Sequence, residues 1–420
     1  MSNASAREGR RDLAALYAAA IAGYPLVASV PVAFDLESRA VSVPFRAVVL
    51  GLSIWTVSRS VRRRELYTGS LWVPLGIFWV LYLARMLSDT FLRPVPLSQP
   101  PDEYFLYAVG TCLVPMLALF TKPSDATLGL ALRLTTFVGA VALVTMGYLS
   151  AQALLAGEFG GVETGRLELW TLNPISLGHL GASVATLAMF QLRMPLNGPR
   201  GSSVALLAAA AIGLVSTGVA ASNGPLLALA INFAFLLFLD WRDGHRVRAL
   251  VCAVVVPFVA LQGALYLEQL GFGVISRAQI ALDDPTRFEL LRGARDQFLA
   301  HPILGSSLEE RVSLTYPHNS FVESFMAVGV VGGLAYTAFH LTSLRRALGL
   351  LIARPASAWL GILCVQYTVS ALFSGSLYAS NTMWALLAAV SAAAEGPAQS
   401  AAVRFPTPLV HPSTIRSPSQ

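Results

Sequence analysis

Residues 134–156 read LTTFVGAVALVTMGYLSAQALLA, a stretch of 23 residues without a single Asp, Glu, Lys or Arg. A helix of that length, rising about 1.5 Å per residue, is long enough to cross a hydrocarbon core of roughly 30 Å. Comparable apolar stretches recur along most of the chain. The segment predicts a transmembrane helix, and its repetition predicts a polytopic membrane protein.

Composition gives the same class. Of 420 residues, 55% are hydrophobic and only 12% are charged, about half of the usual charged share. We predict an all-α fold of about twelve spans, separated mostly by short loops. The predicted spans are Leu13–Phe34, Val41–Val57, Leu71–Leu87, Tyr104–Phe120, Leu134–Ala156, Pro174–Leu192, Val204–Ala221, Pro225–Trp241, Ala249–Leu270, Phe321–Leu341, Ala356–Phe373 and Leu377–Ala394.

The basic residues predict the orientation. With a cytoplasmic N-terminus and an even number of spans, most of the 29 Lys and Arg residues lie in cytoplasmic segments and both termini are inside. The outer basic residues are concentrated in one loop, which holds Arg277, Arg287, Arg292, Arg295 and Arg311. The net charge of +6 therefore indicates a basic inner surface rather than nucleic-acid binding.

Three segments follow from this pattern. Residues 1–395 form the predicted transmembrane domain, and residues 396–420, rich in Pro, Ser and Ala, form a disordered cytoplasmic tail. Residues 271–317 form one long extracytoplasmic loop between spans nine and ten. Within it an amphipathic helix is expected from Arg287 to Ala300, ended by His301-Pro302. A long ordered loop at the membrane face is a suitable place for polar chemistry.

The loop also contains a recognisable pattern. Arg287 precedes Ala300-His301-Pro302-Ile303-Leu304-Gly305, then His318-Asn319-Ser320-Phe321, then Gly329-Val330-Val331-Gly332. This order of elements resembles the O-antigen ligase/polymerase superfamily, with an "R…hPl.G" element, "HN" at the mouth of a helix and "G..G" within it. The resemblance covers about 60 residues. It implies a GT-C-like membrane fold in the inner membrane of a bacterium.

Two other segments fit the pattern less closely. Arg166 through Asn173-Pro174-Ile175 is similar to an "R…nP" stretch before the sixth span. Ser222-Asn223-Gly224 resembles an "SRG" element that opens the eighth span, but Asn223 stands where the pattern has arginine. If that arginine holds a lipid diphosphate, this chain needs Arg166, Arg292 or another cation in its place.

The resemblance implies a glycosyltransferase that moves a polyprenyl-diphosphate-linked oligosaccharide to an acceptor glycan or glycolipid outside the membrane. Guanidinium groups bind diphosphate oxygens in charge-assisted pairs, and a histidine can remove a proton from the attacking hydroxyl. We therefore predict His318 as the base or acceptor-orienting group and Arg287 as the diphosphate contact. Arg166 is the second candidate cation.

Other residues carry open alternatives. Asn319 is expected to cap or orient the tenth span, and Glu323, an acid within that span, is expected to partner His318 or an arginine. Arg292 and Arg295 fit a solvated helix face better than a substrate contact. His179 is expected to be a hydrogen-bonded structural residue, and Arg46 and Arg85 are expected to snorkel or pair.

Metal and cofactor chemistry is not expected. Asp35-Leu36-Glu37 is too short an outer loop for the acidic metal site of other lipid-dependent glycosyltransferases, and no His/Cys cluster offers another. Cys112, Cys252 and Cys364 all fall in apolar spans, which fits neither a disulfide framework nor a metal site. No Gly-rich nucleotide-binding loop is present, so a cytosolic nucleotide-sugar donor is not expected.

Several functions stay open at this point. A polymerase, extending an exopolysaccharide or O-antigen chain alongside a flippase and a chain-length regulator, is the first hypothesis. A ligase would use a lipid core as acceptor instead. A secondary transporter also suits twelve spans, but it predicts two similar halves and a long central cytoplasmic connection, which are absent here. A non-catalytic scaffold of a polysaccharide-export complex is the last alternative.

Overall fold

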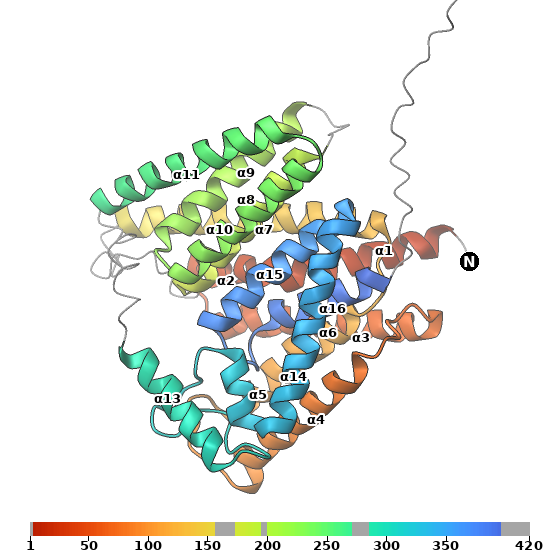
Figure 1. Ribbon diagram of the computed structural model, residues 1–420, viewed down its shortest axis with the longest axis vertical. Helices are drawn as coiled ribbons and strands as arrows, with labels where there is room; N and C mark the ends of the chain where they lie inside the picture. Colours follow the sequence, from red (N-terminus) through yellow and green to blue (C-terminus); the bar gives the residue numbers. More distant parts are fainter. Residues whose placement is uncertain (1–2, 156–172, 195–199, 271–284, 396–420) are drawn as a thin grey trace, which may run out of the picture.

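The computed structural model describes residues 3–155, 173–194, 200–270 and 285–395, and every regular element within them is helical. Eleven helical segments of this part of the chain are long and apolar enough to cross a membrane. The first span is continuous from α1 through η1 to α2, and another runs from α4 into η2 (Figure 1).

The helices of the first half are α1 (Asn3–Ala18), η1 (Ala19–Gly23), α2 (Tyr24–Phe34), α3 (Ser38–Arg63), α4 (Trp72–Leu87), η2 (Ser88–Leu92), α5 (Pro101–Phe105), η3 (Leu106–Leu113), α6 (Val114–Leu119) and α7 (Asp125–Leu155). Those of the second half are α8 (Pro174–Arg193), α9 (Arg200–Val219), α10 (Asn223–Arg242), α11 (Arg246–Gln269), α13 (Pro285–Ala300), α14 (Ser320–Ala353), η5 (Pro355–Ser357), α15 (Ala358–Phe373) and α16 (Asn381–Glu395).

The predicted all-helical membrane class is confirmed, and eleven of the predicted spans have a counterpart of sufficient length. The twelfth, predicted at Leu377–Ala394, corresponds to α16, which has only 15 residues. Every residue from Thr382 to Ala393 is buried, so α16 lies inside the bundle rather than at its edge. Both the count of twelve and the cytoplasmic placement of the termini stay predictions.

Aromatic side chains fill the centre of the bundle. Phe78 and Trp79 of α4 lie against Trp384 of α16, with ring centroids 5.5 and 5.0 Å apart. Tyr336 and Phe339 of α14 pack on the same indole. Large rings of this kind supply much of the contact area that holds helices together in lipid, where no water drives their association.

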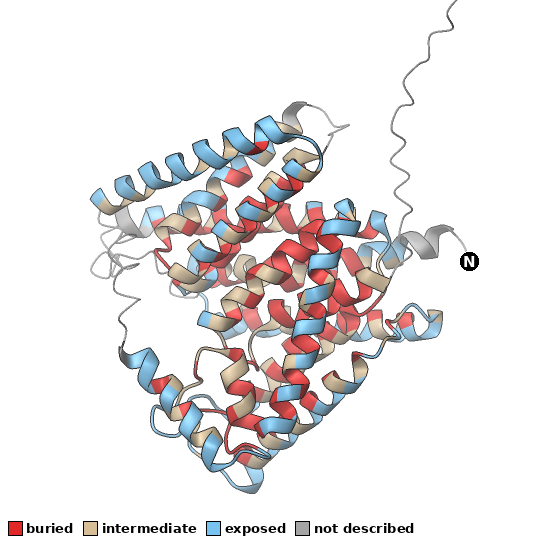
Figure 2. Cartoon of the chain, in the orientation of Figure 1, coloured by how far each residue is buried: buried red, intermediate tan, exposed pale blue. Residues whose placement is uncertain are grey.

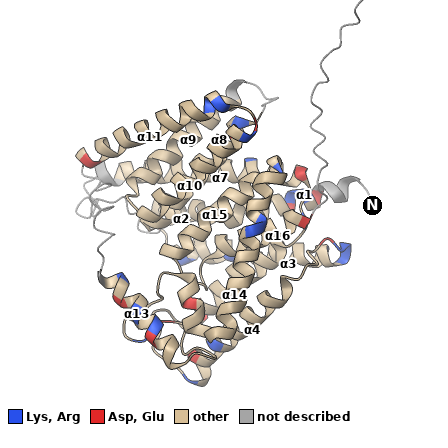
Figure 3. Cartoon of the chain, viewed as in Figure 1, with Lys and Arg blue, Asp and Glu red and all other residues tan. Residues whose placement is uncertain are grey.

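The outer helices present apolar side chains to their surroundings. No residue in the most apolar stretch of α11 is buried, although that stretch is rich in Val and Leu. Figure 2 shows this helix as exposed along nearly its whole length at one edge of the molecule. Figure 3 shows that the middle of the bundle is almost free of charged residues. A bilayer is the solvent that matches this surface.

Helix α14 positions the candidate site because it is not continuous. Gly329 has φ 68° and ψ −167°, which interrupts the helix nine residues after it begins at Ser320. The short first part packs near α13, and the longer second part continues through the bundle against α4, α15 and α16 (Figure 1). The residues that end the long loop are therefore held at one end of the bundle.

Candidate functional site

The loop between α13 and α14 is fixed to the kink of α14 by a pair of glycines. Gly305 has φ +69°, and a Cβ there would lie 2.3 Å from the Ala327 carbonyl oxygen. A Cβ on Gly329 would lie 2.3 Å from the carbonyl oxygen of Ile303. The Val330 amide donates to the Pro302 carbonyl at 2.7 Å. Two parts of the family-like pattern, "hPl.G" and the first glycine of "G..G", therefore form one backbone contact.

Arg85 of α4 holds the same loop from the other side. Its guanidinium donates to the backbone carbonyls of Leu304, Gly305, Ser306 and Ala327 at 2.9 to 3.0 Å. Asp89 lies one turn further along, pairs with Arg85 at 3.4 Å and accepts the amide proton of Leu308. We call this arrangement of Arg85, Asp89, Gly305 and Gly329 the loop clasp. The expectation that Arg85 pairs is confirmed.

His318 lies where the loop meets α14, and its backbone has an unusual conformation. Its φ is 53°, in the left-handed region that few residues other than glycine adopt. The half-buried imidazole packs against the ring of Tyr316, with 4.6 Å between centroids. Burial, and secondly the positive charge of Arg287, lower the pKa of His318 below its ordinary value of 6.5. At neutral pH the imidazole is therefore neutral and able to accept a proton.

Arg287 lies on α13 and reaches across to the end of α15. Its guanidinium donates to the Phe373 carbonyl at 3.1 Å, and its side chain is otherwise exposed. Arg287 lies close enough to His318 for its charge to lower the imidazole pKa, although no hydrogen bond joins the two side chains; their roles in the reaction stay predictions. Arg292 is exposed on the same helix without a hydrogen bond to the described residues, and Arg295 pairs only with its neighbour Asp296.

Asn319 caps α14, which confirms that expectation. Its side-chain oxygen accepts the amide protons of Phe321 and Val322 at 3.1 Å, and its side-chain nitrogen donates to the Leu372 carbonyl at 3.2 Å. With both ends of the amide in use, Asn319 acts first as a structural link between α14 and the end of α15.

The prediction that Glu323 partners His318 or an arginine is wrong. The carboxylate is fully buried and accepts the Leu377 amide proton at 3.0 Å and the Tyr82 hydroxyl at 3.4 Å. The physical reason is helical geometry: Glu323 lies one turn into α14 and faces the bundle interior, whereas His318 precedes the helix. Glu323 therefore anchors a neighbouring backbone segment.

That segment is residues 374–380, between α15 and α16, and we call it the serine loop because it contains Ser374, Ser376 and Ser380. Arg287 and Asn319 bind the two carbonyls just before it, and Glu323 binds the amide of Leu377 within it. Sequence reading treated this segment only as a short gap between two spans. Its run of serines beside a glycine was the available signal, because such residues are unusual where two helices are simply joined inside a membrane.

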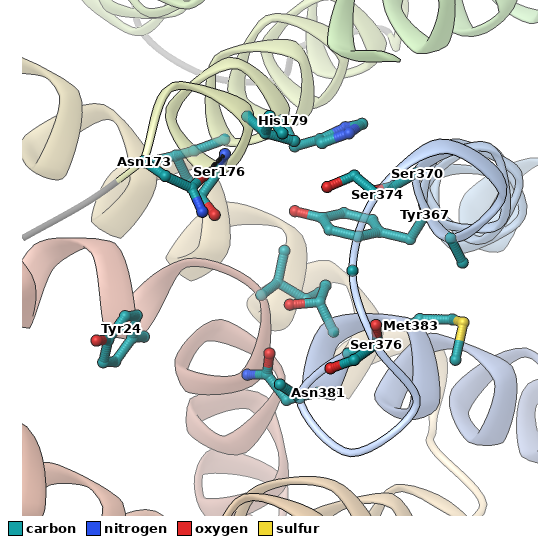
Figure 4. Close-up of a pocket in the computed structure, with 18 of the residues that line it drawn as sticks. Tyr24, Asn173, Ser176, His179, Tyr367, Ser370, Ser374, Ser376, Asn381 and Met383 are labelled. Atoms are coloured by element: carbon teal, nitrogen blue, oxygen red, sulfur yellow. Dashed lines mark hydrogen bonds between the residues drawn. The ribbon is translucent and has the colours of Figure 1, made fainter. Parts of the chain in front are cut away.

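The serine loop forms one wall of a cavity of about 280 Å³. Figure 4 shows polar groups around it from several helices: Tyr24 of α2, the N-cap Asn173 of α8 with Ser176 and His179 of that helix, Tyr367 and Ser370 of α15, and Asn381 of α16. Tyr316 also lines it, and the same ring packs against His318. The cavity therefore adjoins the predicted catalytic histidine.

A second cavity of about 210 Å³ shares Tyr24, Ser176 and Asn381 with the first and contains Arg46. The guanidinium of Arg46 donates to the Tyr107 hydroxyl at 2.7 Å and lies 4.3 Å from the centre of that ring. An arginine beside the serine loop is thus supplied by α3. The sequence around Arg46 predicts only that it snorkels or pairs, and it contains no signal that links Arg46 with the site.

Two predicted site residues remain. Arg166 lies outside the described residues. Asn223 is the first residue of α10, and it does not line either cavity. Its neighbour Gly224 is close to His179, since a Cβ at Gly224 would lie 3.7 Å from the imidazole Nε2. Among the described residues no group of three or more His, Cys, Asp or Glu side chains could hold a metal ion.

The helices and the cavity beside His318 define a polytopic membrane protein with a polar site at one end of its bundle. The model of the O-antigen ligase family matches residues 204–337, from α9 to just beyond the kink in α14, and so covers Arg287 and His318. This match supports membership of the O-antigen ligase/polymerase superfamily. A comparison with curated proteins finds no match. Lipid-linked oligosaccharides and glycan acceptors are the general partners that this family implies.

Proposed function

We propose that this protein is a glycosyltransferase of the bacterial inner membrane that transfers a polyprenyl-diphosphate-linked oligosaccharide en bloc to a growing O-antigen or exopolysaccharide chain. The observation that carries the proposal is the position of Arg287 and His318 beside one polar cavity: Arg287 binds the carbonyl that precedes the serine loop, and His318 packs on Tyr316 of the cavity wall. The family match over the same loop supports the reaction class.

In the proposed reaction the acceptor hydroxyl attacks the anomeric carbon of the donor sugar. The imidazole of His318 accepts the hydroxyl proton. Its lowered pKa keeps the ring unprotonated at neutral pH, as a base requires. The bond from the anomeric carbon to the diphosphate oxygen breaks, and polyprenyl diphosphate leaves with the electron pair. Arg287 stabilises the negative charge on that leaving group, and Arg46, which lines the adjoining cavity, is a further cation among the described residues.

The first test is genetic. In a strain lacking this gene, we expect single lipid-linked repeats to accumulate and long polymer to disappear, and His318→Ala should behave in the same way. His301→Ala is the matched control, because His301 belongs to the same loop but is exposed. Normal long-chain polymer in the His318→Ala strain would contradict the assignment.

The second test uses purified protein in lipid nanodiscs, with the lipid-linked oligosaccharide extracted from the deletion strain as donor. Product formed without added nucleotide supports transfer and argues against a transporter or a scaffold. The ligase alternative has its own support, because the matching family model bears that name. Offering the lipid core and the lipid-linked repeat as separate acceptors decides between ligation and polymerisation.

A further inference from the structure

The described residues that line the serine loop cavity carry no formal charge. Its 22 lining residues include no Asp, Glu, Lys or Arg. They provide hydroxyl and amide groups instead, from serines, Asn173 and Asn381, together with the rings of Tyr24, Tyr316, Tyr367 and Tyr378. Among the described residues that line the cavity, none is a cation that could bind a diphosphate. A neutral ligand with many hydroxyls and an apolar ring face would find both hydrogen-bonding groups and aromatic surface.

His179 is a buried polar side chain of this cavity wall that has no hydrogen-bonding partner among the described residues. Its side chain is 3% exposed, and neither ring nitrogen has a hydrogen-bonding partner in the described part of the protein. The expectation of a hydrogen-bonded structural histidine is therefore wrong. The Tyr367 ring lies beside the imidazole, with 5.8 Å between the ring centroids. Buried polar groups are nearly always paired, so an unpaired one at a cavity wall indicates a missing partner.

His340 shows what a structural histidine looks like in the same protein. It is equally buried, on α14, but its Nδ1 lies 3.0 Å from the Tyr336 hydroxyl and its Nε2 lies 3.0 Å from the Thr368 hydroxyl. The fold thus satisfies both nitrogens of one intramembrane histidine and leaves both nitrogens of the other free. Figure 4 shows His179 at the cavity wall, on the same side as Ser370 and Ser374.

The cavity also has the right position for a substrate subsite. Tyr316 lines it and packs on His318, and Ser374 directly follows the Phe373 carbonyl that Arg287 binds. A ligand held by His179 would therefore extend towards the two residues of the proposed reaction. Its volume of about 280 Å³ is near the lower end of the roughly 300–1,000 Å³ found for small-molecule sites, which suits a single sugar unit.

We propose that the serine loop cavity binds one neutral sugar residue of the glycan substrate, with His179 as its buried hydrogen-bonding partner. This inference rests on the proposed transfer function for the identity of the glycan. The sugar hydroxyls form hydrogen bonds with the serine hydroxyls, the asparagine amides and the imidazole. The tyrosine rings pack against the C–H face of the sugar. His179 is assigned to binding and not to proton transfer. His318, the proposed base, does not itself line the cavity and contacts it through the ring of Tyr316.

Binding without turnover is the sharpest test. Purified protein in nanodiscs is mixed with methyl glycosides of a neutral hexose, a 6-deoxyhexose, an N-acetylhexosamine and a hexuronic acid, and binding is followed by saturation-transfer NMR. We expect at least one neutral glycoside to bind and the hexuronic acid not to bind. His179→Phe should weaken binding at least tenfold, and His340→Phe should bind like the wild type although it loses thermal stability.

A second variant guards against misfolding. Ser370→Val narrows the cavity from α15 without touching His179, and it should also weaken binding while its melting temperature stays near that of the wild type. Equal binding by wild type and His179→Phe would overturn the inference, as would failure of every neutral glycoside to bind. In the nanodisc transfer assay, competition of the bound glycoside with the donor or with the acceptor identifies which substrate supplies the sugar.

The two proposals can fail separately. If the protein binds neutral glycosides through His179 but forms no transfer product, the transfer function is wrong and the sugar site stands. If transfer proceeds and His179→Phe keeps both its binding and its KM for donor and acceptor, the sugar site is wrong and the transfer function stands.

Discussion

Arg85→Met breaks the loop clasp at its most connected residue. Arg85 donates to four backbone carbonyls of the loop and of α14, and it is the ion-pair partner of Asp89, whose side chain is 2% exposed. Methionine keeps much of the apolar stem but removes every donor. The loop that carries His318 should then lose its attachment to α4.

The size of the effect follows from the buried carboxylate. Removing one partner of a buried ion pair costs about 3–5 kcal/mol, because the other charge is left uncompensated. The lost hydrogen bonds to carbonyls add to this, although Arg85 is 18% exposed and water replaces some of them. We therefore expect the free energy of unfolding to fall by about 3–5 kcal/mol. Asp89→Asn in the same chain should recover part of the loss, because it removes the uncompensated charge.

Reversible unfolding in mixed micelles of increasing SDS content measures this free energy, and hydrogen exchange of residues 301–319 reports on the loop itself. Arg295→Met is the control. Arg295 is 62% exposed and, among the described residues, pairs with the exposed Asp296 alone, so its loss should cost less than about 1 kcal/mol. If Arg85→Met destabilises the protein no more than Arg295→Met, or leaves exchange of the loop unchanged, the clasp is not what holds the loop.

Three further predictions concern the same region. Gly329→Ala should lower the melting temperature and slow transfer, because the new Cβ would lie 2.3 Å from a carbonyl oxygen and a φ of +68° is unfavourable for alanine. Gly147→Ala is the control: Gly147 has open space around it, so the melting temperature should stay unchanged or rise. Glu323→Leu should destabilise the serine loop by about 1–3 kcal/mol through the unpaired Leu377 amide, visible as faster hydrogen exchange there; unchanged exchange would refute that anchor. Because the pKa of His318 is lowered, the acidic decline of transfer should lie at lower pH than an ordinary histidine would give. Arg287→Gln, which removes one of the two causes, should move that decline of the residual activity to higher pH. If the acidic decline of activity lies at the same pH in Arg287→Gln as in the wild type, protonation of His318 does not cause that decline.

Part of the candidate site was visible in the sequence because it is contiguous there. Arg287, the hPl.G element, His318 and Asn319 lie within 33 residues, and their types alone indicate anion binding, a helix stop and a helix cap. In the structure Arg287 binds the carbonyl before the serine loop and lies close enough to His318 for its charge to lower the imidazole pKa. What could not be read was the structural meaning of the glycines, whose contact joins residues 24 positions apart through backbone atoms.

The other half of the site was not visible because its parts are scattered. Arg46, Arg85, His179 and the serine loop come from α3, α4, α8 and the α15–α16 connection. Each is separated in the sequence by dozens of residues or more, and each has an ordinary explanation when read alone. Glu323 shows the same limit, because its proximity to His318 in the sequence wrongly predicted a contact that the direction of α14 prevents.

The sequence by itself determined the membrane class and most of the spans, because the energy of placing a helix in lipid depends mainly on its own length and composition. It also determined the residue types of the long loop, and with them the family resemblance. Only the tertiary structure decided that Glu323 anchors the serine loop and that His179 lacks a partner while His340 has two. Hydrogen bonds within a bundle are made between helices, and a single sequence records the groups but not which of them meet.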